Sequence, residues 1–142
     1  MWSNWWGFEM EAFDGIPQNV SLVARAGARA IVHSDDDLEI QRLNHEAAKA
    51  LRAGREAGLD LSRNEALRWI TANPAWALGI QDRVGTLEAG KNADVVLWTG
   101  DPFSVYSKAQ RVWVDGALVY DRTDPDRHPR SDFELGGPRP QK

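Results

Sequence analysis

The most constraining feature of this 142-residue sequence is a short, mostly apolar run, residues 28–35, that ends in a carboxylate. The run is too short for a helix. A glycine precedes it and an acidic cluster, residues 35–37, closes it, which is typical of a buried parallel strand that meets the start of a helix. Because every second side chain of an extended backbone lies on one face, Ile31, His33 and Asp35 are expected to point the same way.

Helical patterns flank this run. Pro17 near a helix start and Gly27 just past its end frame a helix of about ten residues. Residues 38–54 place apolar side chains at three- and four-residue spacing, which predicts an amphipathic helix. The pair Ser62 and Glu65 matches a capping box, in which each side chain satisfies a free amide at a helix start.

The next helix is expected to run from this capping box to about Ala72. Pro74 ends it, because the residue before a proline is pushed out of helical geometry. A short turn of helix then follows and closes at Gly79. The order up to this point is therefore helix, strand, helix, helix.

From Val84 onward the pattern changes to short strands. Residues 93–98 are strand-like, and Asp115-Gly116 between two apolar runs is a strong hairpin signal. The last residues are rich in proline and charge and predict a mostly disordered tail. We expect three parts: barrel elements with the following helix over 1–80, a β-rich segment over 81–121, and the tail over 122–142.

Composition excludes several classes of protein. The net charge of −4 and the isoelectric point near 5.3 argue against a nucleic-acid surface, since the basic residues are scattered among acids. No apolar stretch approaches the ~20 residues that cross a bilayer, and the start lacks the pattern of a secretion signal, so we expect a soluble chain. With no cysteine, any metal needs His, Asp, Glu or a modified residue as ligand.

Three motifs give the chain a family resemblance. The run IVHSD at 31–35 looks like the end of a last barrel strand, and TANPA at 71–75 with ALG at 77–79 is similar to the helix that follows such a barrel. The run GTLEAGKNADVVLW at 85–98 matches a segment that enters a small β-sandwich. Together they resemble the C-terminal part of the metal-dependent amidohydrolase superfamily, in its imidazolonepropionase-like and prolidase-like branch, over roughly residues 1–121.

The resemblance implies an α/β fold, with the terminal βα elements of a (β/α)₈ barrel followed by strands of a small, composite β-sandwich. It implies that Asp35 ligates a divalent metal, zinc by expectation, and accepts a proton from the attacking water. The hydrolysed bond would be an amide or related C–N bond. His33, on the same strand face, and Trp5 and Trp6, in a loop at the active-site end, are candidates to contact the substrate.

The sequence departs from the family in its metal ligands. The family's His-x-His pair and its later ligands have no counterpart here, a full barrel takes roughly 250 residues, and one carboxylate cannot hold a catalytic zinc. We therefore expect no tightly bound metal and no activity from the chain alone. The expected partner is the N-terminal remainder of the enzyme, and unpaired barrel strands predict self-association.

Each candidate also has a structural interpretation. Asp35 could only complement the dipole of the next helix, His33 could be a satisfied core histidine, and Trp5 and Trp6 could simply pack their loop. A different class, a non-catalytic interaction or assembly module, would use the tryptophan-rich start and the β unit to bind another chain. A sugar-binding role for the clustered tryptophans is a third possibility.

Overall fold

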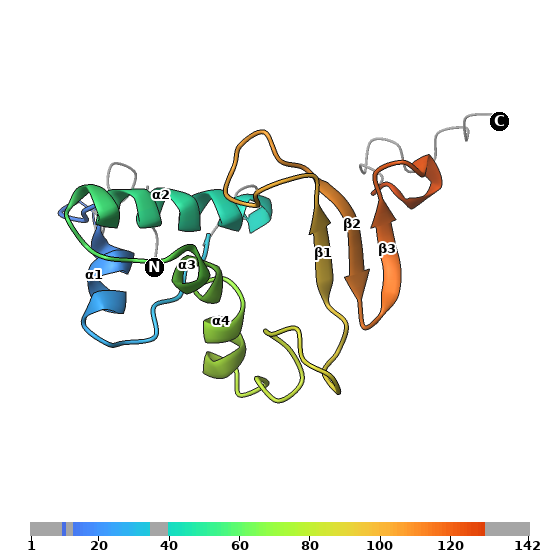
Figure 1. The fold of residues 1–142 in the computed structure, drawn as a ribbon, viewed down its shortest axis with the longest axis horizontal. Coiled ribbons are helices and arrows are strands. Elements are labelled where there is room, and N and C mark those ends of the chain that lie inside the picture. Colours follow the sequence, from blue (N-terminus) through green and yellow to red (C-terminus); the bar gives the residue numbers. More distant parts are fainter. Residues whose placement is uncertain (1–9, 11–12, 35–39, 130–142) are drawn as a thin grey trace.

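The computed structural model describes residues 10, 13–34 and 40–129. Helices gather on one side of the molecule and a three-stranded sheet lies beside them (Figure 1). The elements in chain order are α1 (Asn19–Arg25), η2 (Ile40–Arg42), α2 (Leu43–Glu56), α3 (Arg63–Arg68), α4 (Ala72–Ala77), β1 (Val95–Trp98), β2 (Ala109–Val114), β3 (Ala117–Asp121) and η3 (Pro125–Arg127).

The two helices predicted around residues 28–35 are confirmed as α1 and α2, and they approach each other closely. Ser21 on α1 is fully buried, and its hydroxyl donates a 2.6 Å hydrogen bond to the carbonyl oxygen of Ala50 on α2. Gly54 makes the approach possible, because a Cβ there would lie 2.4 Å from Oγ of Ser21. The core around this contact comprises Val20, Ala30, Val32, Ala47, Ala50, Leu51, Leu61, Ala66 and Trp69.

Residues 28–34 do not form a paired strand in the described part of the chain, so the strand predicted over 28–35 is not confirmed there. A parallel strand takes its hydrogen bonds from strands on either side, and no described strand lies beside this segment. The helical region supplies two bonds in their place. The amide of Val32 donates to the carbonyl oxygen of Trp69 at 3.1 Å, and Nδ2 of Asn73 donates to that of Ala30 at 2.8 Å.

The capping box at the start of α3 is confirmed. The Ser62 hydroxyl accepts from the amide of Glu65, and the Glu65 carboxylate accepts from the amide of Ser62 at 2.6 Å. The Ser62 hydroxyl also donates to this carboxylate at 2.7 Å. The bonds from the amide and then from the hydroxyl of Ser62 hold the pKa of Glu65 below its usual value. The helix ends at Arg68, however, earlier than predicted. Pro74 then lies in the first turn of α4, where its missing N–H costs no helical bond.

The β-rich part forms one antiparallel sheet in the order β1-β2-β3. The predicted hairpin joins β2 to β3, with Val114 opposite Ala117. Asp115 and Gly116 both have positive φ angles, 50° and 79°, which a two-residue hairpin turn of this handedness requires. The sequence signal at these two residues therefore predicted the turn, and the register changes at an irregularity between Val112 and Trp113.

The helices and the sheet are joined through the loop between β1 and β2. Nδ2 of Asn44 on α2 donates to the carbonyl oxygen of Pro102 at 2.5 Å, and Arg63 on α3 forms an ion pair with Asp101. Figure 1 shows this loop reaching from the sheet to the start of α2. Two polar contacts thus tie the two parts together.

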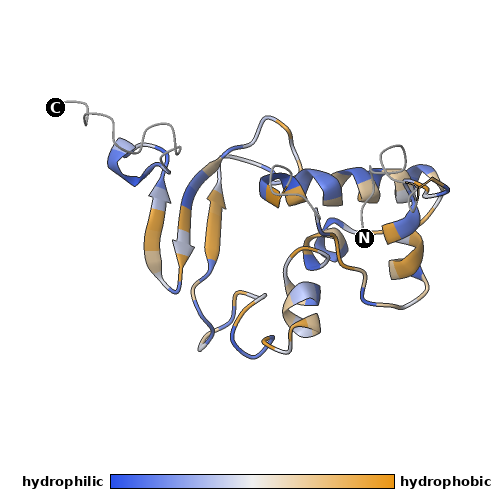
Figure 2. Ribbon diagram, turned by 180° about the vertical axis from the view of Figure 1, so that it is seen from behind, coloured by the Kyte–Doolittle hydropathy of each residue, from blue (hydrophilic) through white to orange (hydrophobic). Residues whose placement is uncertain are grey.

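The sheet remains a single layer among the described elements. No described α-helix packs against its strands. Figure 2 shows apolar residues along all three strands. Val96 and Leu97 are each 43% exposed, and Val119 is 50% exposed. In a stable three-stranded sheet, at least one apolar face normally packs against another element. The exposed apolar residues of this sheet could therefore pack against a further layer.

Two further expectations concern membrane-spanning helices and the predicted C-terminal tail. No described helix has the length and apolar character needed to cross a membrane. Within the segment predicted as a tail, residues 122–129 contain η3 and contact β3, while residues 130–142 lie outside the described part.

Candidate functional site

The segment that leads to Asp35 has two different faces. Ala30, Val32 and Ser34 are 2%, 3% and 6% exposed and pack toward the helices, whereas Ile31 is half-buried and His33 is exposed. This alternation is the period of two expected for an extended segment. The face that carries His33 is therefore the open one. Asp35, Trp5 and Trp6 lie outside the described residues, so their positions relative to His33 are untested.

Residues of the α3–α4 region hold this segment in place. Asn73 and Trp69 bond to the backbone on either side of Ile31, and Trp69 is itself 2% exposed. The guanidinium of Arg29 lies 4.3 Å from the ring centre of Trp76. In the sequence, Asn73 was identified only as part of the TANPA motif. The structure shows that its side chain bonds to the backbone of Ala30, in the segment that carries His33.

The described residues do not fit a catalytic zinc site. No group of three or more His, Asp or Glu side chains in residues 10, 13–34 and 40–129 is arranged to hold a metal. His45 lies within α2 and His128 follows η3, so neither joins His33. Since a catalytic zinc takes three or so protein ligands, this part of the chain needs ligands from elsewhere.

Two cavities lie away from His33. One, of about 410 Å³, is lined by Ala28 and Arg29 at the entry to the segment and by residues of α3 and α4. The other, of about 710 Å³, lies between α2 and the loop that carries Phe103 and Val105. Neither lining includes His33. The exposed His33 side chain thus lies outside both of these cavities.

The third sequence motif, residues 85–98, has a structural role in the described region. Gly85, with a φ of 91°, lies against α4 so closely that a Cβ would be 2.6 Å from Cβ of Ala75. Lys91 forms a 3.3 Å ion pair with Glu88, and its Nζ donates to Oγ1 of Thr86. The hydrogen bond from Thr86 and the nearby Lys91 lower the pKa of Glu88.

The same motif also anchors the hairpin turn. Oδ1 of Asp94 accepts a 2.8 Å hydrogen bond from the amide of Asp115, and the amide of Gly116 donates to the carbonyl oxygen of Ala93 at 3.1 Å. Nδ2 of Asn92 donates to the Asp115 carboxylate. These contacts give the motif a folding role rather than a catalytic one.

The helix–segment–helix unit followed by a small antiparallel sheet defines the class of protein. The Amidohydrolase family model matches residues 8–120 of the chain. The chain therefore belongs to the amidohydrolase family, which confirms the superfamily inferred from the three motifs.

Relatives support this assignment over part of their own length. The chain is 34% identical over 115 residues to the protein named "Amidohydrolase tasK" of Hapsidospora irregularis, a match that covers 80% of this chain and 11% of the relative. It is 55% identical over 38 residues to an imidazolonepropionase of Shewanella baltica, covering 27% of this chain and 9% of that protein. The chain thus spans about a tenth of each of these two relatives.

Solved structures resemble the fold over most of the chain. An amidohydrolase from Thermotoga maritima superposes with a TM-score of 0.72 and 31% identity, covering 81% of this chain and 29% of that one. An adenosine deaminase from Xanthomonas campestris, solved with bound zinc, superposes with a TM-score of 0.60 and 21% identity, covering 79% and 30%. At that identity the second likeness concerns the fold alone.

Proposed function

We propose that this chain supplies the C-terminal part of a metal-dependent amidohydrolase that hydrolyses C–N bonds of amides, cyclic amides or peptide-like substrates. The single observation that carries the proposal is the family match over residues 8–120. The open face of residues 31–34 supports it, because it is the face on which the period of two would place Asp35. In this proposal, residues 28–35 complete a barrel as its last strand.

Asp35 is the proposed metal ligand and general base. A carboxylate at the end of a barrel strand accepts a proton from the attacking water and returns it to the leaving nitrogen as the C–N bond breaks. A bound divalent metal, zinc in this proposal, would lower the pKa of this water so that it can lose a proton at neutral pH. The described residues make no metal site, and in this proposal the other ligands come from the complementary part of the enzyme.

His33 is the proposed substrate contact of this chain. Its side chain is exposed on the open face of the segment, where a completed barrel would place it toward the interior. Trp5 and Trp6, which precede this segment in the sequence, are proposed to line the same pocket. The indole rings of these two tryptophans would cover the apolar part of a substrate and exclude water from it.

The complementary part of the enzyme, on the same or a separate chain, is the proposed partner. The uncovered sheet supports this. Val96 and Leu97 are exposed apolar residues, and a second sheet of a composite sandwich would bury such residues. The proposal also holds that the chain alone is inactive and that it self-associates. Inactivity is expected because one carboxylate cannot hold a catalytic zinc. Self-association is expected because strand edges and apolar faces lack their neighbours.

Reconstitution tests the proposal. This chain is co-expressed with the N-terminal part of the Thermotoga amidohydrolase that lacks the region equivalent to it. We expect the complex to retain zinc and to release amine from amide substrates, whereas each part alone does neither. Asp35→Asn should abolish turnover, and the neighbouring Asp36→Asn is the matched control. Turnover that survives Asp35→Asn would contradict the assigned role.

The uncovered sheet also favours a second function, a non-catalytic assembly module. The same experiment separates the two. A module would copurify with its partner through the sheet, and the loss of the Asp35 carboxylate would leave both the metal content and the turnover of the complex unchanged. Substitution of Val96 by a charged residue would then remove partner binding and activity together.

A further inference from the structure

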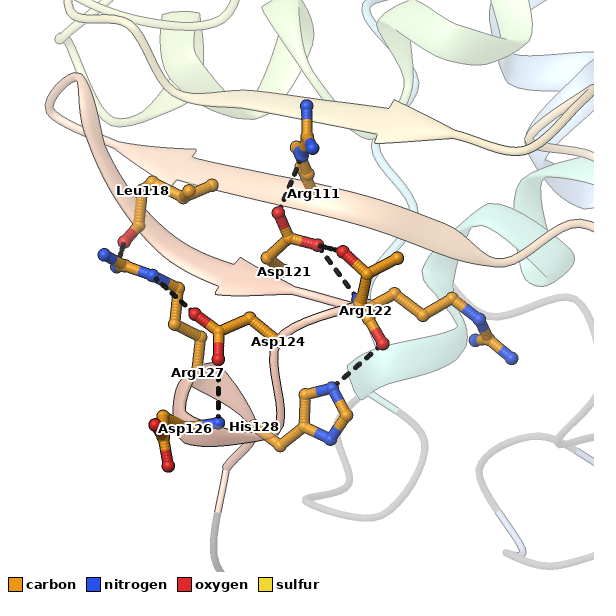
Figure 3. Close-up of polar contacts among 9 residues, drawn as sticks. Arg111, Leu118, Asp121, Arg122, Asp124, Asp126, Arg127 and His128 are labelled. Carbon is orange, nitrogen blue, oxygen red and sulfur yellow. Dashed lines mark hydrogen bonds and ion pairs between the residues drawn. The ribbon is translucent and has the colours of Figure 1, made fainter. Parts of the chain in front are cut away.

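The segment that follows β3 folds back along the outer side of the sheet. We call residues 122–129 the C-terminal cap; they include η3 and lie beyond the residues matched by the family model. Figures 1 and 3 both show η3 on the side of β3 that faces away from β2. We infer that the C-terminal cap closes the outer edge of β3 against strand addition by a second copy of this chain.

One contact of the cap reaches the β3 backbone directly. Nη1 of Arg127 donates a 2.6 Å hydrogen bond to the carbonyl oxygen of Leu118, in the middle of β3. Nε of Arg127 is held by an ion pair of 3.4 Å with Asp124, whose carboxylate also accepts from the amide of Asp126. The guanidinium therefore occupies a backbone acceptor that an incoming strand would use.

A second contact covers the end of the same strand. The ring of His128 stacks on that of Tyr120, with centroids 5.4 Å apart and an angle of 28° between the planes. Nε2 of His128 lies 3.2 Å from the carbonyl oxygen of Arg122. His128 thus contacts both the Tyr120 ring and the backbone at Arg122. Figure 3 shows the second of these contacts.

The cap is anchored where the chain leaves the sheet. Asp121 is 7% exposed, and its carboxylate accepts from Nε of Arg111 on β2 and from the amide and hydroxyl of Thr123. These bonds span the end of the sheet and the first residues of the cap, as Figure 3 shows. They set the direction in which the chain turns back along β3.

The outer edge of β3 has a sequence that favours the addition of another strand. It contains an apolar run of high strand propensity, residues 117–120, in which Val119 is half exposed. In the described region, no side chain bonds to the backbone of the other edge strand, β1. A sheet with one closed and one open edge can add a single neighbour, whereas two open edges permit chains of copies to grow.

The experiment compares two truncations of the full chain. One ends after Thr123 and lacks most of the cap but keeps its anchor on Asp121. The other ends after Pro129 and keeps the whole cap, so it controls for loss of the residues beyond it. Far-UV circular dichroism establishes that both fold. Sedimentation velocity over a range of concentrations gives their masses.

The truncation after Thr123 is expected to show a weight-average mass about twofold or more above that of the intact chain at high concentration. The truncation after Pro129 should match the intact chain. Equal masses for both truncations would overturn the inference. In the intact chain, Arg127→Ala combined with His128→Ala should raise the mass and speed amide exchange at Leu118 and Val119, whereas Arg122→Ala, which removes an exposed side chain of the same charge, should change neither.

This inference is independent of the proposed hydrolase function. A cap that proves dispensable would leave the roles of Asp35 and His33 untouched. Conversely, a reconstituted enzyme that tolerates Asp35→Asn would not affect the assembly of truncated chains. An experiment that contradicts the role of the cap therefore leaves the proposed hydrolase function intact, and the reverse also holds.

Discussion

The side-chain amide of Asn73 donates a 2.8 Å hydrogen bond to the carbonyl oxygen of Ala30, across 43 residues of sequence. Together with the bond from Val32 to Trp69, it holds an extended segment that pairs with none of the described strands. The family motif TANPA thus contributes a donor to the backbone that presents the candidate site. This link between motif and site leads to the first prediction.

Asn73→Ala removes the donor and leaves the buried carbonyl of Ala30 unsatisfied. We expect the free energy of unfolding to fall by about 1–2 kcal/mol. Amide exchange at Val32 should also become faster, because the segment loses one of its two anchors. Asn64→Ala, at an exposed position on α3, is the control and should change stability by less than about 0.5 kcal/mol. Urea unfolding measures both effects, and equal losses would contradict the anchoring role.

The two faces of residues 30–34 predict opposite effects of substitution. Val32→Ala deletes buried methyl groups and should destabilise the chain by about 1–3 kcal/mol. His33→Ala alters an exposed side chain and should leave the unfolding midpoint nearly unchanged. In the reconstituted enzyme, however, His33→Ala should raise KM for the substrate. Thermal unfolding of the chain and kinetics of the complex test this pair of outcomes.

Local signals in the sequence predicted the elements that depend on neighbouring residues. The capping box at Ser62 and the turn at Asp115 were read correctly, because a hydroxyl three residues from a carboxylate and an Asp-Gly pair act over a few residues. The alternation around His33 was also predicted. Periodicity alone, however, could not show that this segment lacks strand partners among the described residues.

The early end of α3 could not be predicted either. The sequence favoured a helix to about Ala72, but α3 ends at Arg68, and the carbonyl oxygen of Trp69 accepts from Val32. That bond joins residues 37 positions apart, and no local pattern reports it. The side-chain bond from Arg127 to the carbonyl oxygen of Leu118, nine residues away, likewise lies outside any local pattern, and it attaches part of the predicted tail to β3. Contacts between separate elements are therefore what the sequence alone did not predict.

Gly54→Ala should destabilise the chain although alanine favours helices. The added Cβ would lie 2.5 Å from Cβ of Ser21 and 2.8 Å from Cδ1 of Leu61, so α1 and α2 must separate. The expected cost is about 1–3 kcal/mol, which exceeds the gain of about 1 kcal/mol in helix propensity. Ser21→Gly in the same chain should recover part of the loss. Independent, additive effects of the two changes would contradict this close contact.

Asp94 is expected to stabilise the hairpin turn through the amide of Asp115. Asp94→Ala leaves that amide without its acceptor and should cost about 1 kcal/mol, with faster exchange at Asp115 and Gly116. Asp94→Asn keeps a carbonyl oxygen at the same place and should behave almost as the natural chain does. Hydrogen exchange followed by NMR distinguishes the two variants. Equal exchange in both would show that the charge of Asp94, rather than its acceptor oxygen, matters.

Asp121 makes the sheet sensitive to acid. Hydrogen bonds from the side chain and amide of Thr123, and then from Arg111, lower its pKa from 3.8 to about 2. Because the pKa is lower in the folded state, its contribution to stability is present above the unfolded pKa and is lost as the pH falls from about 4 to 2. Asp121→Asn should therefore be less stable than the natural chain at pH 6, and the difference should shrink toward pH 2. Asp60→Asn, at an exposed position, should leave this pH dependence unchanged in thermal unfolding. A difference between the natural chain and Asp121→Asn that stays constant from pH 6 to pH 2 would mean that the carboxylate contributes no pH-dependent stability.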